Sequence, residues 1–139
     1  MRKRWHAEGQ RTQRRKYFME INEITGIIIQ EAIQIHRDVG PGLMESVYEE
    51  LLCYRLMKYH GLDVKRQGKI DLIYEDIKMD IDLRYDLKVE NKVLVELKSQ
   101  EIIPPVAYKI FKTYLRLTNI SVGLMINFNV EILKDGIKE

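Results

Sequence analysis

The chain lacks the features that would place it in a specialised structural class. Its single cysteine, Cys53, cannot form an internal disulfide, which excludes a disulfide-stabilised scaffold and favours a reducing, cytoplasmic setting. No apolar run approaches the roughly 20 residues of a membrane span, and neither zinc-type Cys/His spacing nor a glycine-rich phosphate loop occurs. The 139 residues therefore predict one globular domain with its own apolar core.

Acidic residues are scarce at the start of the chain. Segment 1–18 carries seven basic residues against Glu8 alone, a net charge of +6, whereas the whole chain carries +2 and residues 19–139 therefore carry −4. Three interpretations of this segment remain open: a basic arm that contacts nucleic-acid phosphates, a disordered tail, or the product of an upstream start codon with Met19 as the true initiator. We favour the last two, because the acidic remainder gives no global electrostatic support for nucleic-acid binding.

Two helices are expected first. Apolar residues recur at three- and four-residue spacing over 21–39, where a helix should end before the Gly-Pro-Gly sequence of 40–42. A second apolar stripe predicts a helix over 43–60, with Gly61 as its left-handed C-terminal residue.

Beyond Gly61 the apolar period becomes two, which indicates strands. A helix begins at the Pro-Pro pair of 104–105 and runs to about 117. Strands are predicted on both sides of it, over 69–74, 77–89, 92–99, 120–127 and a short segment 130–133. This order predicts an α/β domain with a mixed sheet.

Two predicted strand segments, 83–89 and 92–99, can pair in more than one register. A two-residue turn would mix apolar and charged side chains on one face, whereas a three-residue loop over 90–92 separates them. We therefore predict the three-residue loop, with Asn91 or Lys92 in the left-handed conformation. The face that becomes apolar or aromatic holds Tyr85, Leu87, Val89, Val93, Val95 and Leu97.

The polar face of this hairpin gathers two acids and an amine. In the predicted register Asp86 lies opposite Glu96, with Cβ atoms about 5 Å apart, and Lys98 projects from the same face. Two such carboxylates repel unless one is protonated or a cation such as Mg²⁺ or Mn²⁺ lies between them. A nearby lysine can activate water or offset transition-state charge, which favours phosphodiester hydrolysis. An exposed strand pair with alternating charges explains the hairpin pattern equally well.

A motif before the hairpin, at residues 36–48, adds to the evidence on function. Residues 42–48 read Gly-Leu-Met-Glu-Ser-Val-Tyr and follow His-Arg-Asp-Val-Gly-Pro. These residues resemble the signature of the GxxExxY protein family, which is grouped with the PD-(D/E)XK nuclease-like superfamily. The resemblance extends through most of 19–136 and includes segments 85–89, 93–98, 114–116 and 123–128.

The resemblance implies a restriction-endonuclease-like core, in which a mixed sheet with an antiparallel hairpin is flanked by helices in the order αβββαβ. It implies a single domain over 19–139 and a magnesium- or manganese-dependent endonuclease or exonuclease. Glu45 would be a third metal ligand, although a glutamate favoured by the helix dipole explains it too. The implied site comprises the catalytic residues Asp86, Glu96, Lys98 and Glu45 and the supporting residues Tyr48, Tyr114 and His36.

One position departs from the family pattern. Related nucleases often place a glutamine four residues before the tyrosine of the closing helix, where this chain has Ile110 before Tyr114. An apolar side chain cannot hold water or phosphate, so a catalytically inactive nuclease fold that binds nucleic acid or a protein partner is the alternative. A third possibility is a homodimer formed through the sheet edge or the first helix.

Overall fold

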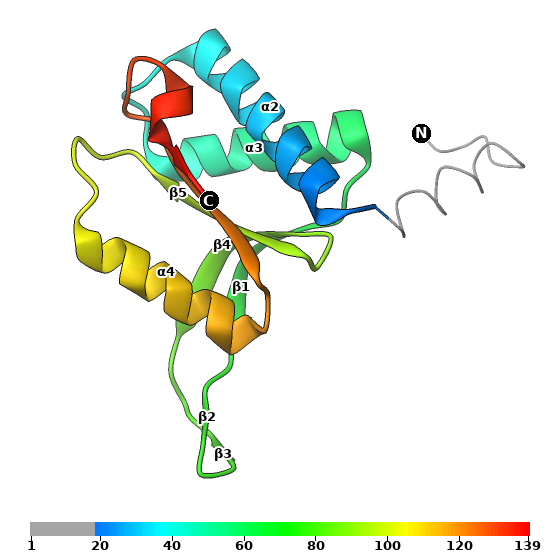
Figure 1. The fold of residues 1–139 in the computed structure, drawn as a ribbon, viewed down its shortest axis with the longest axis vertical. Helices are drawn as coiled ribbons and strands as arrows, with labels where there is room; N and C mark the ends of the chain where they lie inside the picture. Colours follow the sequence, from blue (N-terminus) through cyan, green and yellow to red (C-terminus); the bar gives the residue numbers. More distant parts are fainter. Residues whose placement is uncertain (1–18) are drawn as a thin grey trace, which may run out of the picture.

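The fold is that of a computed structural model, which describes residues 19–139 (Figure 1). The interpretations of segment 1–18 concern residues outside this range. Helix α2 (Ile21–Val39) has the predicted bounds, and α3 (Glu45–His60) begins two residues later than predicted. Gly61 adopts the predicted left-handed conformation, with φ 61° and ψ 27°, and so ends α3. No helix in the described part of the chain has the length and hydropathy needed to cross a membrane.

One five-stranded sheet forms the centre of the domain. Its strands are β1 (Val64–Ile70), β4 (Leu83–Val89), β5 (Val93–Lys98), β6 (Val122–Asn127) and β7 (Ile137–Lys138), in the spatial order β1-β4-β5-β6-β7. Strands β5 and β6 are parallel and are connected through α4 (Pro105–Thr118), while all other neighbours are antiparallel. The predicted mixed sheet and element order are therefore confirmed.

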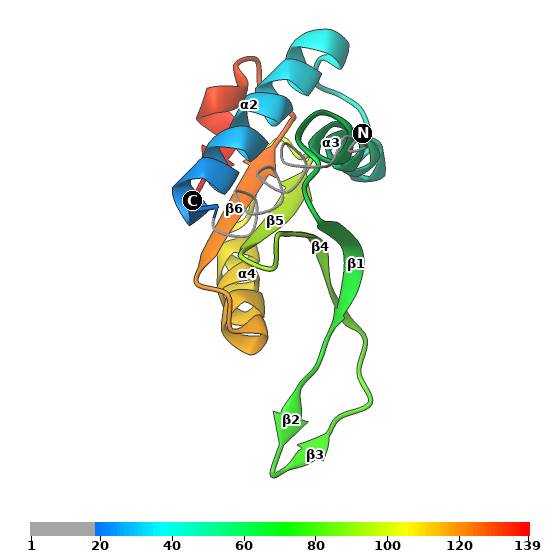
Figure 2. The same ribbon diagram turned by 90° about the vertical axis from the view of Figure 1, so that its right-hand side faces the viewer.

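Two predicted strands differ from the structure. Strands were predicted over 69–74 and 77–89, the second of them half-buried. In the structure the chain between the paired strands β1 and β4 instead forms a projecting ribbon with the short strands β2 (Ile73–Tyr74) and β3 (Ile77–Lys78) (Figure 2). Ile73 and Ile77 are 64% and 62% exposed, because this ribbon extends beyond the helices. The strand predicted over 130–133 is also wrong: Leu133 starts a 3₁₀ turn, Leu133–Gly136, that leads into β7.

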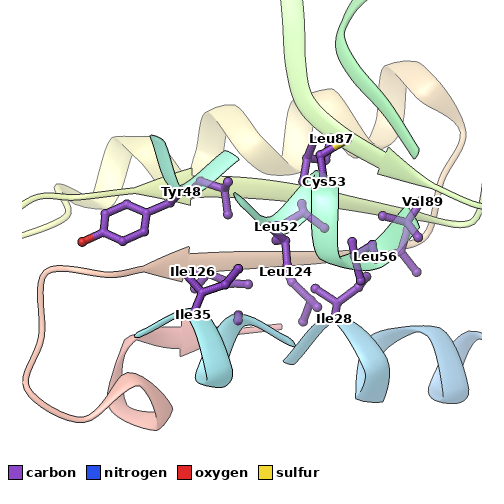
Figure 3. Close-up of a cluster of buried hydrophobic side chains, with 14 of the residues drawn as sticks. Ile28, Ile35, Tyr48, Leu52, Cys53, Leu56, Leu87, Val89, Leu124 and Ile126 are labelled. Carbon is purple, nitrogen blue, oxygen red and sulfur yellow. The ribbon is translucent and has the colours of Figure 1, made fainter. Parts of the chain in front are cut away.

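The helices cover the two faces of the sheet unequally. Helices α2 and α3 pack on one face over a large apolar cluster that includes Ile28, Leu52, Leu87 and Leu124 (Figure 3). On the other face α4 buries only Phe111, whose ring lies so close to Gly123 that a Cβ there would come within 2.6 Å. The α2–α3 face therefore provides most of the packing, and the α4 face leaves room for polar side chains.

Candidate active site

The hairpin of β4 and β5 has the predicted register. Val89 pairs with Val93 and Leu87 with Val95 across a loop of three residues. Asn91 is left-handed, as predicted, with φ 54°, but the second left-handed residue is Glu90 and not Lys92. Burial of one face therefore fixes the pairing.

The two faces of the hairpin separate as predicted, except at Tyr85. Its neighbours on the expected apolar face pack under α2 and α3, whereas Tyr85 belongs to the cluster on the α4 side. Its ring lies against Gly68 of β1, where a Cβ would come within 2.0 Å of the phenol. Tyr85 lies where the β1–β4 ribbon leaves the body, and the twist of a two-stranded ribbon takes its ring to the α4 side.

Asp86 terminates the backbone pairing of the hairpin. Its Oδ2 accepts a hydrogen bond of 2.8 Å from the backbone N–H of Leu97, beyond the last paired residues. Glu96 and Lys98 follow on the neighbouring strand, with Lys98 Nζ 4.0 Å from Glu96 Oε2. The structure thus brings together the two acids and the amine that the sequence placed on one face.

Burial makes these carboxylates electrostatically unusual. Desolvation and the neighbouring Asp86 charge, which Lys98 only partly offsets, together raise the pKa of Glu96 to about 8. Desolvation also raises the pKa of Asp86, against the opposing effect of the Leu97 hydrogen bond. Among the described residues, Glu96 Oε1 is a buried oxygen without any hydrogen-bond partner. A buried acceptor of this kind calls for a proton or a cation.

Tyr114 of α4 belongs to the same environment. Burial raises the pKa of its phenol, and the charges of Glu96 and Asp86 add to the increase. Ile110, one helical turn earlier, is 46% exposed. The position at which related nucleases often carry glutamine therefore presents an apolar side chain to solvent.

Glu45 lies at the N-terminus of α3 and reaches β5 beyond Lys98. Its Oε2 accepts a hydrogen bond of 3.2 Å from the backbone N–H of Ser99. Both residues line a cavity of about 660 Å³ together with Gly42 and Asn129. Glu45 is near enough for its charge to raise the pKa of Glu96, after the larger effects of burial and Asp86. Within residues 19–139, however, no three acidic, histidine or cysteine side chains are grouped closely enough to hold one metal ion.

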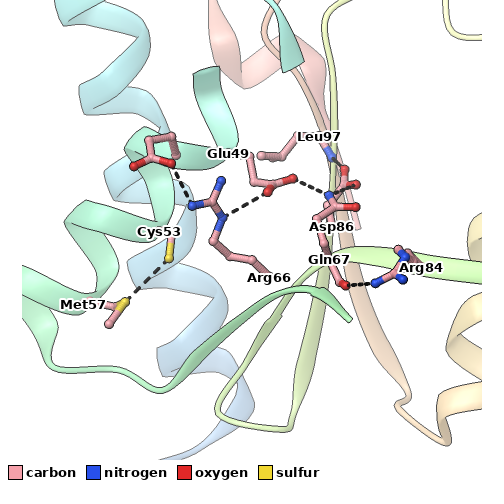
Figure 4. Close-up of polar contacts among 9 residues, drawn as sticks. Glu49, Cys53, Met57, Arg66, Gln67, Arg84, Asp86 and Leu97 are labelled. Atoms are coloured by element: carbon pink, nitrogen blue, oxygen red, sulfur yellow. Dashed lines mark hydrogen bonds and ion pairs between the residues drawn. The ribbon is translucent and has the colours of Figure 1, made fainter. Parts of the chain in front are cut away.

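Two site residues were missed by sequence reasoning. Gln67 Nε2 donates to Asp86 Oδ1 at 3.3 Å and to Glu49 Oε1 at 2.7 Å (Figure 4). Glu49 is almost fully buried and also accepts a hydrogen bond of 3.1 Å from Arg66 Nε. Glu49 lies one helical turn after Glu45, a spacing that could have identified it.

Gln67 is held in an unfavourable backbone conformation. Its φ is 48°, and it forms no regular pair with Asp86 although its neighbours on both sides are paired with β4. Arg84 Nη1 donates to its carbonyl oxygen at 3.0 Å. No residue type in the sequence signals this conformation, which depends on contacts made by the folded chain.

The supporting residues Tyr48 and His36 lie elsewhere. The Tyr48 hydroxyl donates to the Gly40 carbonyl at 2.6 Å and accepts from the Leu43 N–H at 3.1 Å, so it holds the turn before Glu45. His36 Nε2 lies 2.8 Å from the Val130 carbonyl, and these contacts fix loops rather than reach the carboxylates.

The oxygen donors at Asp86 and Glu96 fit a hard divalent cation. Carboxylate oxygens are the ligands that Mg²⁺ and Mn²⁺ accept, and a cation would satisfy the unpartnered Glu96 Oε1. The donor set also fits a metal that keeps several waters, because residues 19–139 bring no group of three possible ligands together here.

Comparison with known proteins gives a single result. No curated protein and no solved structure matches the chain. A family model described as the PD-(D/E)XK nuclease superfamily matches residues 22–139, which include all of the fold except the first residue of α2 and every candidate residue from His36 to Tyr114. Nucleases of this superfamily generally use divalent metal ions. The chain belongs to the PD-(D/E)XK nuclease superfamily.

Proposed function

We propose that this protein is a magnesium- or manganese-dependent nuclease that hydrolyses phosphodiester bonds in DNA or RNA through Asp86, Glu96 and Lys98. The observation that carries the proposal is the unpartnered buried Glu96 Oε1, beside the Asp86 carboxylate and near the Lys98 ammonium. Structural carboxylates are normally satisfied by protein donors, so an unsatisfied one supports a site that awaits a cation.

Each side chain has a distinct role in the proposal. Asp86 and Glu96 hold the cation, which when bound neutralises phosphate charge and lowers the pKa of a coordinated water. Lys98 donates hydrogen bonds to the attacking water or to phosphate oxygens and offsets developing negative charge. Gln67 is a positioning residue, because its amide fixes Asp86 and separates it from Glu49. Glu45 assists from the cavity wall.

We further assign the chain to the GxxExxY group within the superfamily, because the structure gives each signature residue a physical purpose. Gly42 has φ 99°, a conformation that other residues rarely adopt. Tyr48 ties the ends of that turn together through its hydroxyl. Glu45 is thereby directed towards the end of β5.

Cleavage assays test the proposal directly. Labelled single-stranded, duplex and branched DNA and single-stranded RNA are incubated with the protein in Mg²⁺, in Mn²⁺ or in EDTA. We expect metal-dependent products that disappear with Asp86→Asn and persist with Asp38→Asn, a matched change at an exposed position of α2. Absence of products from every substrate in both metals would contradict the proposal.

Metal binding provides a second measurement that needs no substrate. Because the pKa of Glu96 is about 8 in the metal-free protein, binding must release a proton at neutral pH. Mn²⁺ titration by calorimetry in buffers of different ionisation enthalpy should show that proton, and affinity should rise with pH up to about 8. Unchanged affinity over that range would contradict a role for Glu96 as a ligand.

A binding protein without catalysis is the second candidate, and the exposed Ile110 favours it. In that case nucleic acid binds without cleavage, and Lys98→Ala behaves like the parent protein. Introducing Ile110→Gln separates the candidates, since it should increase cleavage only if the remaining machinery is active.

A further inference from the structure

A projecting arm, residues 71–82, has apolar side chains that the protein does not cover. The arm comprises β2, β3 and their connections and extends away from the helices (Figure 2). Ile73, Tyr74 and Ile77 are each more than 60% exposed. An isolated two-stranded hairpin is at best marginally stable in water, so a surface that covers these residues would stabilise the arm.

The arm is strongly acidic, which limits what can cover it. It carries five acidic residues and a single basic one, Lys78, which pairs with Asp71 at 3.3 Å. Such a charge repels nucleic-acid phosphates. The chemistry of the arm therefore fits a partner surface that is both apolar and basic.

The outer face of α4 has that chemistry. Ile102, Val106 and Ile110 are spaced by four residues and are 78%, 55% and 46% exposed, so they form one apolar stripe that continues into α4. Helix α4 contains three basic residues and no acidic residue, although Glu101 precedes the helix. The basic residues Lys109, Lys112 and Arg116 are exposed and, within residues 19–139, form no ion pair with a carboxylate.

We propose that the partner is a second copy of this chain, in a symmetric dimer in which the arm of each copy docks on the outer face of α4 of the other. The two surfaces are complementary in charge, and both are exposed in a single copy. A two-fold axis allows both contacts to form at once, so that two arm–α4 contacts hold one dimer.

A second apolar and basic patch lies on α3, but it is a poorer docking surface for the arm. Tyr54 and Tyr59 are half exposed there, but Lys58 lies over both rings at 5.5 and 5.8 Å. Arg55 is engaged by Glu31 and by the Tyr59 ring. The cations of this patch already have partners within the chain, whereas those of α4 form no ion pair with any residue that the structure describes.

Charge exchange tests the dimer without metal or nucleic acid, so its outcome is independent of the proposed nuclease activity. Variant one reverses two charges of the arm with Glu75→Lys and Asp80→Lys. Variant two reverses two charges of α4 with Lys109→Glu and Lys112→Glu. A control matched to variant one, Asp38→Lys with Glu131→Lys, raises the net charge by the same amount at exposed positions outside both surfaces. Circular dichroism confirms that each variant is folded.

Sedimentation velocity should show a dimer for the parent and the control. Either reversal should weaken dimerisation at least about tenfold, because like charges then face one another in both contacts. Mixing the two variants should restore the dimer, since each arm then meets an α4 of opposite charge. A monomeric parent at about 100 µM, or a dimer insensitive to both reversals, would overturn the proposal. So would loss of nucleic-acid binding in variant two with unchanged sedimentation, which would assign α4 to nucleic acid.

Discussion

Two glutamates differ in how the protein compensates their charge: Glu31, which is buried between α2 and α3, and Glu96, which is partly buried on the α4 side of the sheet. Glu31 accepts hydrogen bonds from Arg55 Nε and from His60 Nε2, the latter at 2.7 Å. Burial alone would raise the pKa of Glu31, but these partners outweigh it and the pKa lies below its ordinary value. Glu96 keeps one buried oxygen without a partner, and burial raises its pKa to about 8.

In the proposed function, this difference separates a structural acid, Glu31, from a metal ligand, Glu96. Glu31 connects two helices, and its charge is compensated within the protein. Glu96 lies with Asp86 on a face that α4 covers only partly, and Lys98, 4.0 Å away, offsets its charge only in part. Loss of solvent acts on both carboxylates, so burial alone does not separate them; the missing hydrogen-bond partner of Glu96 Oε1 does.

The largest expected effect concerns Lys98, the cation beside the unsatisfied acid. Lys98→Ala should lower the rate of metal-dependent cleavage by at least about 100-fold, because charge stabilisation at the scissile phosphate is lost. Lys65→Ala, at an exposed lysine of β1, is the matched control and should leave the rate unchanged. Initial rates on the best substrate in Mn²⁺ measure both. Equal rates for the two variants would remove Lys98 from the mechanism.

The second expected effect is a change in the stability of the folded protein that depends on the protonation of Glu96. Folded Glu96 keeps a proton that the unfolded chain releases between pH 4.5 and 8, so stability should fall as pH rises through that range. In EDTA at pH 9, Glu96→Gln should therefore stabilise the protein, by up to about 5 kcal/mol for a pKa raised from 4.5 to about 8 at roughly 1.4 kcal/mol per pKa unit. Urea denaturation at pH 5 and pH 9 measures the difference. A variant less stable than the parent at pH 9 would mean that the Glu96 charge is compensated within the chain.

The same substitution at Glu31 should destabilise the protein, whereas Glu96→Gln should stabilise it. Glu31→Gln weakens the contacts with Arg55 and His60, and we expect a loss of about 2 kcal/mol at pH 7. Because the folded pKa is lowered, the stabilisation by Glu31 is present above pH 4.5 and is lost as pH falls through the folded pKa. The loss caused by Glu31→Gln should therefore shrink under acid conditions. Urea denaturation at pH 7 and pH 3.5 measures this, and an equal loss at both values would contradict the pairing.

Much of the candidate site could be predicted because burial constrains it. Only one register of the β4–β5 hairpin puts its apolar side chains on one face, so Asp86, Glu96 and Lys98 follow from alternation alone. The order of helices and strands follows similarly from apolar periodicity. Tyr85 was misplaced, since alternation does not include the twist of a ribbon that leaves the body.

The rest depends on contacts between distant segments. The arm has the alternating pattern of a half-buried strand, but the pattern cannot tell whether a helix lies above it. The environment of Glu49 is set by Arg66 and Gln67 of β1, which local sequence does not bring to α3. The left-handed conformation of Gln67 likewise accompanies contacts with distant segments, since its side chain donates to Glu49 and Asp86 and its carbonyl accepts from Arg84.

The smallest expected effect comes from removing the Gln67 amide that lies between Glu49 and Asp86. Gln67→Gly relieves a backbone with φ 48°, which is favourable, but removes the amide between Glu49 and Asp86. We expect the relieved backbone and the lost hydrogen bonds nearly to cancel, so that the free energy of unfolding changes by less than about 1 kcal/mol. Mn²⁺ affinity should fall about tenfold, because Asp86 is no longer fixed. Asn119→Gly, at the left-handed end of α4, is the matched control and should leave metal affinity unchanged. If Gln67→Gly bound Mn²⁺ as tightly as this control, Gln67 would be a residue of the fold and not of the site.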